Sequence, residues 1–388
     1  MLSMKSQPLG LYIHWPFCVS KCPYCDFNSH VRDRVDHKRW EKALLKELSY
    51  VGEKTKGRKL NSVFFGGGTP SLMAPETIHA LINALDKYWI IDNPEISMEA
   101  NPNSVEINKF QHFRQAGVNR VSLGIQSLDT AALKFLGRAH NVQEAMRAIE
   151  IAATTFDRYS FDLIYALPGQ TLAEWEKQLK EALPLIRDHM SLYQLTIEPG
   201  TAFYTAYARK DFTLPKGNLA ADLYERTHAM LLEKGIDRYE VSNHAVQGRE
   251  CQHNLIYWRY QDYAGIGPGA HGRLTLGQQK FATKCYRAPE TWLEHVETNG
   301  HAIQEKTPLN EEDQLIETLM MGLRLKEGIH LENFKNTFHQ PIENFIDISK
   351  LASLIEEGYM EQSPSHLKAT DEGLVRLNGI LEFLTPNR

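Results

Sequence analysis

The sequence lacks what membrane-spanning, secreted and nucleic-acid-binding chains usually show. No uninterrupted apolar stretch approaches the roughly 18 residues of a membrane-spanning helix, and the first ten residues are too polar for a secretion signal. The formal net charge of -5 over 388 residues leaves no basic surplus for nucleic acid or for an anionic membrane. These absences predict a cytoplasmic protein without a nucleic-acid partner.

Cysteine is also scarce, and its count of five is odd. Cys18, Cys22 and Cys25 lie within eight residues, and the next cysteine, Cys251, follows more than two hundred residues later. This spacing argues against a disulfide framework and favours metal-binding thiols in a reducing compartment. A four-iron cluster normally takes four cysteine thiolates, so three would leave one iron open to an outside ligand. The alternative, a zinc site, would need further ligands nearby, and the sequence offers no second pair.

Strand-like and helix-like patterns alternate through the first half of the chain. Six strand–helix repeats predict a parallel sheet with right-handed crossovers. Because a full barrel would need two more repeats, we expect an α/β fold of the open (β/α)6 partial TIM-like barrel type. The expected strands are 11–15, 62–65, 96–99, 120–125, 161–166 and 192–197, and the expected helices are about 37–55, 75–88, 104–116, 129–153, 171–187 and 218–234.

Three regions follow from this pattern. Residues 1–235 would form the barrel core, 236–305 an irregular extension rich in Tyr, Trp, His and Gly, and 306–388 a mostly helical, winged-helix-like C-terminal domain. Winged helices often bind DNA, but residues 310–388 hold seven Lys or Arg against fourteen Asp or Glu. That balance argues against phosphate contact, so we expect a lid or a partner surface instead.

Glycine and polar residues recur where the predicted strands end. The run from Gly66 to Gly68, followed by Thr69, lets backbone approach a ligand, although a tight strand-to-helix turn would also explain it. Ligands of barrel folds bind at the carboxyl ends of strands. Polar residues at comparable positions are Glu99, Gln126, Arg138 and Asp162. Glu99 and Arg138 could be ordinary solvated charges, whereas Asp162 sits inside an apolar strand and needs a partner.

A second candidate site lies in the extension, in the run Cys251-Gln252-His253-Asn254-Leu255-Ile256-Tyr257-Trp258. His, Tyr and Cys are all axial ligands of haem iron, and aromatic rings stack on a porphyrin. The alternative is that His253 and Asn254 only brace a loop. His253 is our first candidate for a haem contact.

Taken in order, these motifs resemble the radical-SAM superfamily and, within it, the oxygen-independent coproporphyrinogen III oxidase (HemN) group. The resemblance is closest to the HemW-type haem chaperones and spans nearly the whole chain. It rests on the cysteine triplet and on the runs YIHWPFC, GGGTPS, MEANP, LGIQS, LGRAH, DLIYALPGQ, YQLTIEPGT and HNLIYW. The oxidases continue the triplet to a fourth cysteine, where this chain has Phe27, as HemW-type proteins do.

The resemblance implies a 4Fe-4S cluster on Cys18, Cys22 and Cys25, with S-adenosyl-L-methionine (SAM) on the open iron. The positions that match the contacts of this SAM are Tyr12, Gly67 and Glu99. The oxidase group holds a second SAM, and the positions that match its contacts are Tyr24, Gly68, Thr69, Gln126, Arg138 and Asp162.

The same resemblance implies the function. HemW-type proteins bind haem and pass it to respiratory haemoproteins without oxidase activity. We therefore expect haem and a respiratory haemoprotein acceptor as partners. We expect the protein to associate peripherally with the membrane when that acceptor is membrane-bound. A homodimer is compatible with the resemblance. Two alternatives stay open: anaerobic coproporphyrinogen III dehydrogenase, by oxidative decarboxylation through a 5′-deoxyadenosyl radical, and a radical-SAM enzyme with an unrelated substrate.

Overall fold

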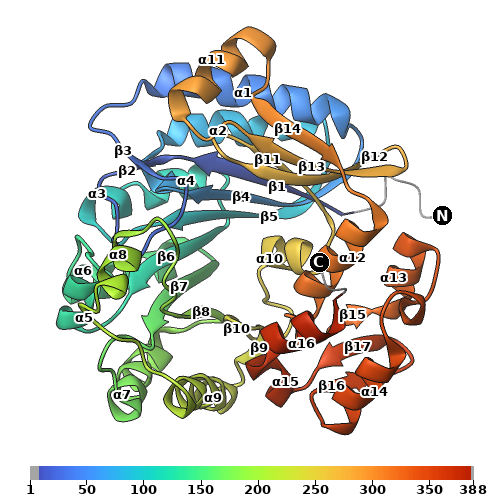
Figure 1. Ribbon diagram of the computed structural model, residues 1–388. Coiled ribbons are helices and arrows are strands. Elements are labelled where there is room, and N and C mark those ends of the chain that lie inside the picture. The colour runs from blue at the N-terminus through green and yellow to red at the C-terminus, as the bar shows by residue number, and fades with distance from the viewer. Residues whose placement is uncertain (1–7, 386–388) are drawn as a thin grey trace.

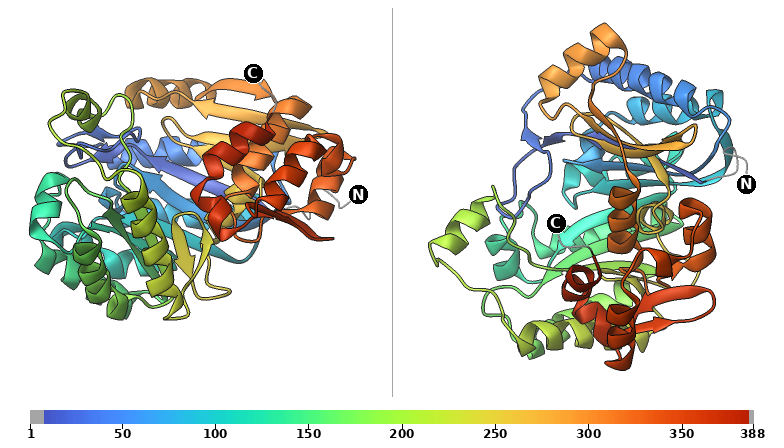
Figure 2. Two further views of the ribbon diagram at one scale, coloured as in Figure 1. Left: turned by 60° about the horizontal axis from the view of Figure 1, so that its bottom comes forward. Right: turned by 45° about the vertical axis from the view of Figure 1, so that its right-hand side comes forward.

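The computed structural model describes residues 8–385, in which one open, twisted sheet is the central element (Figures 1 and 2). Six parallel strands form its middle, and their pairing confirms the predicted α/β architecture. In sheet order they are β1 (Leu9–Trp15), β4 (Lys59–Gly67), β5 (Ile90–Ala100), β6 (Arg120–Gln126), β7 (Arg158–Tyr165) and β8 (His189–Gln194). β1 and β4 are linked through β2 (Phe17–Cys18), β3 (His30–Val31) and the first helix.

Helices cover the outer face of these strands (Figure 1). They are α1 (His37–Lys54), α2 (Pro75–Asn83), α3 (Ser104–Ile107), α4 (Phe110–Ala116), α5 (Thr130–Phe135), α6 (Val142–Thr155), α7 (Leu172–Ala182), α8 (Ala202–Ala208) and α9 (Asn218–Leu232). Asn141 with Glu144, and Thr171 with Glu174, form capping boxes that start α6 and α7. The helix predicted over 129–153 is two helices, because Gly137 lies between them with a φ of +65°.

The segment expected to be irregular, about 236–300, instead extends both edges of the sheet. At one edge of the sheet, β10 (Asn243–Ala245) pairs with β8, and β9 (Asp237–Glu240) pairs with β10. At the other edge, β11 (Asp262–Ile266) pairs in parallel with β1. Beyond β11 the sheet continues with β12 (His271–Leu276), β13 (Gln279–Cys285) and β14 (Ile303–Pro308). The helices α10 (Gln252–Trp258) and α11 (Pro289–Asn299) belong to the same segment. The prediction of irregular structure is therefore wrong, because these strands are defined by their pairing with β8 and β1, which are distant in the sequence.

Alternate residues of β5 to β8 face the interior of the open barrel, as strand geometry requires. The outward set, which includes Met98, Leu123, Phe161 and Met190, packs into the main hydrophobic core. The inward set is polar and includes Glu95, Ser97 and Glu99 on β5, Arg120 and Ser122 on β6, Ser160 and Asp162 on β7, and His189, Ser191 and Tyr193 on β8. The barrel thus encloses polar groups that need partners.

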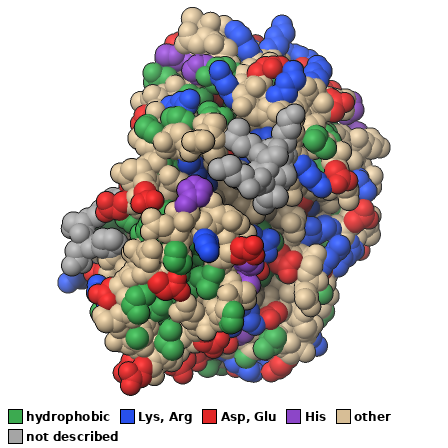
Figure 3. All heavy atoms as spheres, turned by 90° about the vertical axis from the view of Figure 1, so that its right-hand side faces the viewer, with side chains coloured by type: hydrophobic (Ala, Val, Ile, Leu, Met, Phe, Trp, Pro, Cys, Tyr) green, Lys and Arg blue, Asp and Glu red, His purple; other side chains and the backbone are tan. Residues whose placement is uncertain are grey.

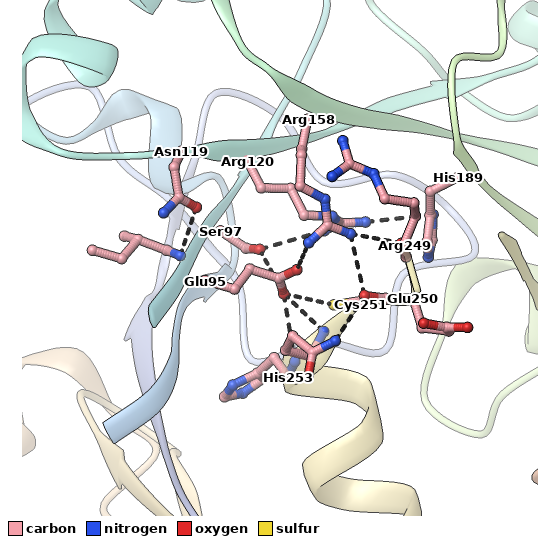
Figure 4. Close-up of polar contacts among 12 residues, drawn as sticks. Glu95, Ser97, Asn119, Arg120, Arg158, His189, Arg249, Glu250, Cys251 and His253 are labelled. Carbon is pink, nitrogen blue, oxygen red and sulfur yellow. Dashed lines mark hydrogen bonds and ion pairs between the residues drawn. The ribbon is translucent and has the colours of Figure 1, made fainter. Parts of the chain in front are cut away.

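Many of those partners lie in the barrel floor that Figure 4 shows. The Glu95 carboxylate accepts hydrogen bonds from Arg158 Nη1 at 2.6 Å, from the thiol of Cys251 at 3.3 Å and from the backbone N–H of Gln252 at 3.0 Å. Arg158 Nη2 donates to the carbonyls of Arg249 and Glu250 at 2.6 and 3.2 Å. This network fastens the start of α10 to β5 and β7, so α10 closes the floor.

The C-terminal module, residues 309–385, has a hydrophobic core of its own. It contains α12 (Glu311–Gly322), β15 (Ile329–His330), α13 (Leu331–Phe338), α14 (Ile348–Glu356), β16 (Met360–Gln362), β17 (His366–Ala369), α15 (Asp371–Val375) and α16 (Leu377–Leu384). Its helices and the β16–β17 hairpin agree with the predicted mostly helical, winged-helix-like domain. Acidic and basic side chains are interspersed on the face that includes this module (Figure 3). Among residues 8–385, no helix is long and apolar enough to cross a membrane.

A buried carboxylate ties the added strands to the first helix. Glu47 of α1 is fully buried and accepts hydrogen bonds from the backbone N–H groups of Gly267 and Ala302, both at 2.8 Å, and from Trp292 Nε1 at 2.9 Å. Burial raises the pKa of Glu47 to about 7, although these donors act in the opposite direction.

We expect Glu47→Gln to destabilise the protein by about 2 kcal/mol, because the amide NH2 leaves buried donors without an acceptor. The measurement is the urea midpoint of unfolding of the full chain. The matched control is Glu297→Gln, which removes an exposed ion pair with Arg39 and should shift the midpoint little. Equal shifts in the two variants would contradict the role of Glu47.

Candidate functional site

A cavity of about 1220 Å³ opens where the carboxyl ends of the parallel strands meet the segment 18–29. This segment, called the cysteine loop below, carries the cysteine triplet and contributes ten residues to the cavity wall. The strand ends, the segment from β8 to α9 and residues 374–379 of the C-terminal module supply the rest. Of the predicted site residues, the structure places these at the cavity: Cys18, Cys22, Tyr24, Cys25, Gly67, Gly68, Thr69, Glu99, Gln126, Arg138 and Asp162.

The three cysteines of the loop are free thiols, and each sulfur lies near a polar group. Thr69 Oγ1 donates to Cys18 Sγ at 3.4 Å, Arg138 Nη1 donates to Cys22 Sγ at 3.2 Å, and Ser29 Oγ lies 3.8 Å from Cys25 Sγ. Burial raises the pKa of Cys18 and of Cys25. Metal ligation would require these thiols to lose their protons.

Among residues 8–385, no three His, Cys, Asp or Glu side chains converge closely enough to hold a single metal ion. A four-iron cluster takes each thiolate on a separate iron, so its ligands need not converge on one point. The donor set itself, three thiols facing one cavity with hydrogen-bond donors beside them, suits such a cluster.

Close packing holds the cysteine loop against the barrel. A Cβ on Gly137 would lie 2.6 Å from Cδ of Pro23, so only glycine lets the end of α5 pack there. The carbonyl of Pro23 accepts a hydrogen bond from the backbone N–H of Phe203 at 2.9 Å. At the far end of the loop, Asn28 Nδ2 donates to the carbonyls of Pro268 and Arg287, both at 2.9 Å.

The glycine run packs tightly as well as lining the cavity. A Cβ on Gly67, whose φ is +111°, would lie 2.5 Å from the His14 ring, and a Cβ on Gly68 would lie 2.8 Å from the carbonyl oxygen of Phe17. The tight-turn alternative therefore explains part of this motif. The N–H of Gly67 also donates to Glu99 Oε2 at 3.1 Å, which joins the run to the end of β5.

Two carboxyl groups face the cavity from neighbouring parts of the barrel. Burial, with the Asp162 charge as a second cause, raises the pKa of Glu99 to about 8. Burial also raises the pKa of Asp162 to about 6, against hydrogen bonds from Ser191 and Ser122, the latter at 3.2 Å. Asp162 thus has the partners that an acid in an apolar strand requires. Carboxyl groups of this kind suit ribose hydroxyls.

Arg138 and Gln126 complete this side of the cavity. Arg138 donates to Asn101 Oδ1 at 2.5 Å, to the Gly124 carbonyl at 2.9 Å and to the Tyr24 hydroxyl at 3.4 Å. Its Nε and the Oε1 of Gln126 are buried and without a hydrogen-bond partner. A buried polar atom without a partner is costly, so both atoms fit a ligand that would supply one.

Tyr12 and His253 lie outside the cavity-lining set. The Tyr12 hydroxyl lies 3.0 Å from His14 Nδ1, and the rings of both residues pack against the glycine run. His253 is 1% exposed, with Nδ1 at 2.7 Å from Ser62 Oγ, Nε2 at 2.8 Å from the Tyr257 hydroxyl, and its ring stacked on Phe64. The predicted contacts at Tyr12 and His253 stay predictions, and the packing of His253 counts against a haem contact and favours the bracing alternative.

Sequence reasoning missed several residues of the cavity wall. Ser122 lies within β6, where no such signal exists, but Asn101 was detectable, because it follows the end of β5 close to Glu99. Tyr193, near the end of β8, carried a similar but weaker signal. Arg324 and residues 374–379 gave no signal, since only the fold brings the C-terminal module to the barrel mouth. Their position agrees with the expected lid.

Comparisons with known proteins agree with this geometry. Residues 12–182 match the Radical SAM superfamily model, and residues 309–376 match the model of the HemN C-terminal domain. The heme chaperone HemW of Escherichia coli K12 is 37% identical over 384 residues, which cover 98% of this chain and 99% of that protein. The chain belongs to the HemW family of radical SAM proteins.

One further relative supports the family, and one solved structure supports the fold. The mitochondrial radical S-adenosyl methionine domain-containing protein 1 of Bos taurus is 37% identical over 384 residues, covering 97% of this chain and 87% of that protein. The solved structure of the coproporphyrinogen III oxidase HemN from Escherichia coli matches with a TM-score of 0.80 at 22% identity, covering 98% of this chain and 90% of that one. The second match shows the fold. Membership of the radical SAM family implies an iron–sulfur cluster and SAM.

Gly137→Ala should lower the iron retained per chain after anaerobic reconstitution, because its Cβ would push Pro23 and the cysteine loop away from the barrel. The matched control is Gly200→Ala. Gly200 has a similar positive φ of +83°, but a Cβ there would meet nothing within 4 Å. In both variants, alanine at a positive φ adds backbone strain of about 1 kcal/mol. The two variants therefore differ only in the contact between the new Cβ and Pro23, which Gly200→Ala lacks. Equal iron content in the two would contradict the anchoring role.

Proposed function

We propose that this protein is a haem chaperone: it binds haem and passes it to haemoproteins, and it carries a 4Fe-4S cluster and SAM. The observation that carries the proposal is the full-length similarity to proteins named heme chaperone HemW, combined with a cavity of 1220 Å³. Small-molecule pockets usually enclose about 300–1,000 Å³. The cavity therefore offers room for haem in addition to SAM.

Within this proposal, Cys18, Cys22 and Cys25 would hold the cluster, and the open iron would take SAM. Glu99 and Asp162 would accept hydrogen bonds from ribose hydroxyls, and Arg138 would neutralise a carboxylate or a cluster thiolate. The cluster would supply a Lewis-acidic iron and, when reduced, an electron for SAM. Phe27, which is 56% exposed at the cavity, stands where a fourth cysteine would follow the triplet.

The acceptor, the assembly and the location belong to the same proposal. We propose a respiratory haemoprotein as the acceptor, peripheral association with the membrane when that acceptor is membrane-bound, a cytoplasmic location and a homodimeric state. The interspersed surface charges in Figure 3 leave no continuous basic patch on that face for nucleic acid.

Serine at Cys18, Cys22 or Cys25 should remove most of the cluster. After anaerobic reconstitution the wild type should hold about four irons with matching sulfide, and each variant should fall well below half of that. Cys251→Ser and Cys285→Ser are matched controls, because both thiols are buried away from the cavity. Retention of iron in the triplet variants, or zinc in place of iron in the wild type, would contradict the assignment.

Haem titration under the same conditions tests the function itself. The wild type should bind haem with about one equivalent per chain and should leave coproporphyrinogen III unchanged in the presence of SAM and a reductant. Formation of protoporphyrinogen with stoichiometric methionine would replace the chaperone proposal with the dehydrogenase alternative. Visible spectra and chromatography of the porphyrins distinguish the two results.

A further inference from the structure

Haem iron takes axial ligands from His, Cys, Met or Tyr side chains. Among the described residues that line the cavity, the candidates outside the cysteine triplet are His140, Tyr24, Tyr165, Tyr193 and Tyr224. Each can be judged by its exposure and by the partner its polar atom already has. This inference rests on the proposed function, because it asks which group would bind the iron.

Four of the five candidates are occupied or enclosed. His140 is 6% exposed and its Nε2 lies 2.9 Å from the Ile125 carbonyl. Tyr165 is 2% exposed and stacks on Trp175. The two remaining hydroxyls accept hydrogen bonds from arginine: Tyr24 from Arg138 at 3.4 Å and Tyr224 from Arg238 at 2.8 Å.

Tyr193 differs from the other four candidates. Its side chain is 40% exposed although the residue lines the cavity. It follows His189 and Ser191 at intervals of two along β8, so it faces the barrel interior at the end of the strand nearest the cavity mouth. An open aromatic ring in a concave wall offers both an apolar face and an oxygen ligand.

The surroundings of Tyr193 suit a flat apolar molecule with carboxylate arms. Apolar residues line the same cavity from both sides: Leu195 follows β8, Val241 lies in the turn between β9 and β10, and Leu374 and Leu377 belong to the C-terminal module. Arg324 lines it too. Its Nε is buried without a hydrogen-bond partner, while its Nη2 pairs with Glu240 at 3.2 Å. A haem propionate would give that N–H an acceptor.

We infer that Tyr193 supplies the axial oxygen ligand to the iron of ferric haem, which would lie between β8 and residues 374–377 of the C-terminal module. The assignment replaces His253, whose two ring nitrogens already have partners in the barrel floor. It also explains why residues of the C-terminal module line the cavity wall.

The proton of the phenol has a nearby acceptor. The Asp162 carboxyl faces the same cavity and lies within electrostatic reach of Tyr193. A phenolate ligand would require the O–H bond of Tyr193 to break; the Asp162 carboxylate would take that proton, and the iron would give up a water ligand.

The test is a titration of the reconstituted full-length protein with ferric haem, followed by difference spectra against the haem-free protein and by resonance Raman spectroscopy. The wild type should show phenolate bands in the Raman spectrum. Tyr193→Phe should lose them, and its Kd for haem should rise about tenfold or more. Tyr193→His should regain affinity with the spectrum of an imidazole ligand. Tyr204→Phe, a 47% exposed tyrosine of α8 outside the cavity, should behave as the wild type does.

Two results would overturn the assignment, and they differ from failure of the proposed function. Tyr193→Phe with a wild-type spectrum and Kd would exclude Tyr193 as the ligand while haem binding stands. Equal losses in Tyr193→Phe and Tyr204→Phe would also overturn it, since a general effect would then explain both. A wild type that binds no haem would refute the proposed function, and the ligand assignment with it.

Discussion

The alternation of polar and apolar side chains along β5 to β8 is the constraint on which the rest of the structure depends. Outward apolar residues pack the helices, and inward polar residues line a hollow that would be costly to bury without partners. At the floor, Glu95 and Arg158 satisfy one another and hold α10 in place. At the mouth, Glu99 and Asp162 face a cavity instead, and burial raises the pKa of both. One strand pattern therefore produces a closed floor and an open binding surface.

The binding surface is assembled from segments that are far apart in the chain. The cysteine loop lies against Gly137 on one side and the carbonyl of Pro268 on the other. The C-terminal module has a separate hydrophobic core and meets the barrel through ion pairs, among them Arg238 with Asp371 and Lys326 with Asp237. Because the module lines the cavity, its position determines what the cavity can hold.

Local patterns predicted the central strands, the cysteine triplet and the mostly helical C-terminal domain, because each depends on residues close in the sequence. The added strands escaped prediction, since β11 is recognisable only by its pairing with β1, some 250 residues away. Motif membership also did not reveal side-chain direction. His253 belongs to a distinctive motif, yet the path of α10 turns it into the floor, where Ser62 and Tyr257 occupy its nitrogens. Tyr193 opens the run YQLTIEPGT, but it became a candidate only when its exposure within the cavity was known.

Haem delivery is the central claim, and a transfer experiment tests it most directly. The protein is loaded anaerobically with ferric haem, freed of excess haem, and mixed with an equimolar apo-haemoprotein while the Soret bands are followed. The account predicts that haem leaves this protein and appears in the acceptor in equal amounts, faster than from an inert haem carrier such as albumin. Haem that stays bound, or that reaches the acceptor no faster than from albumin, would contradict it.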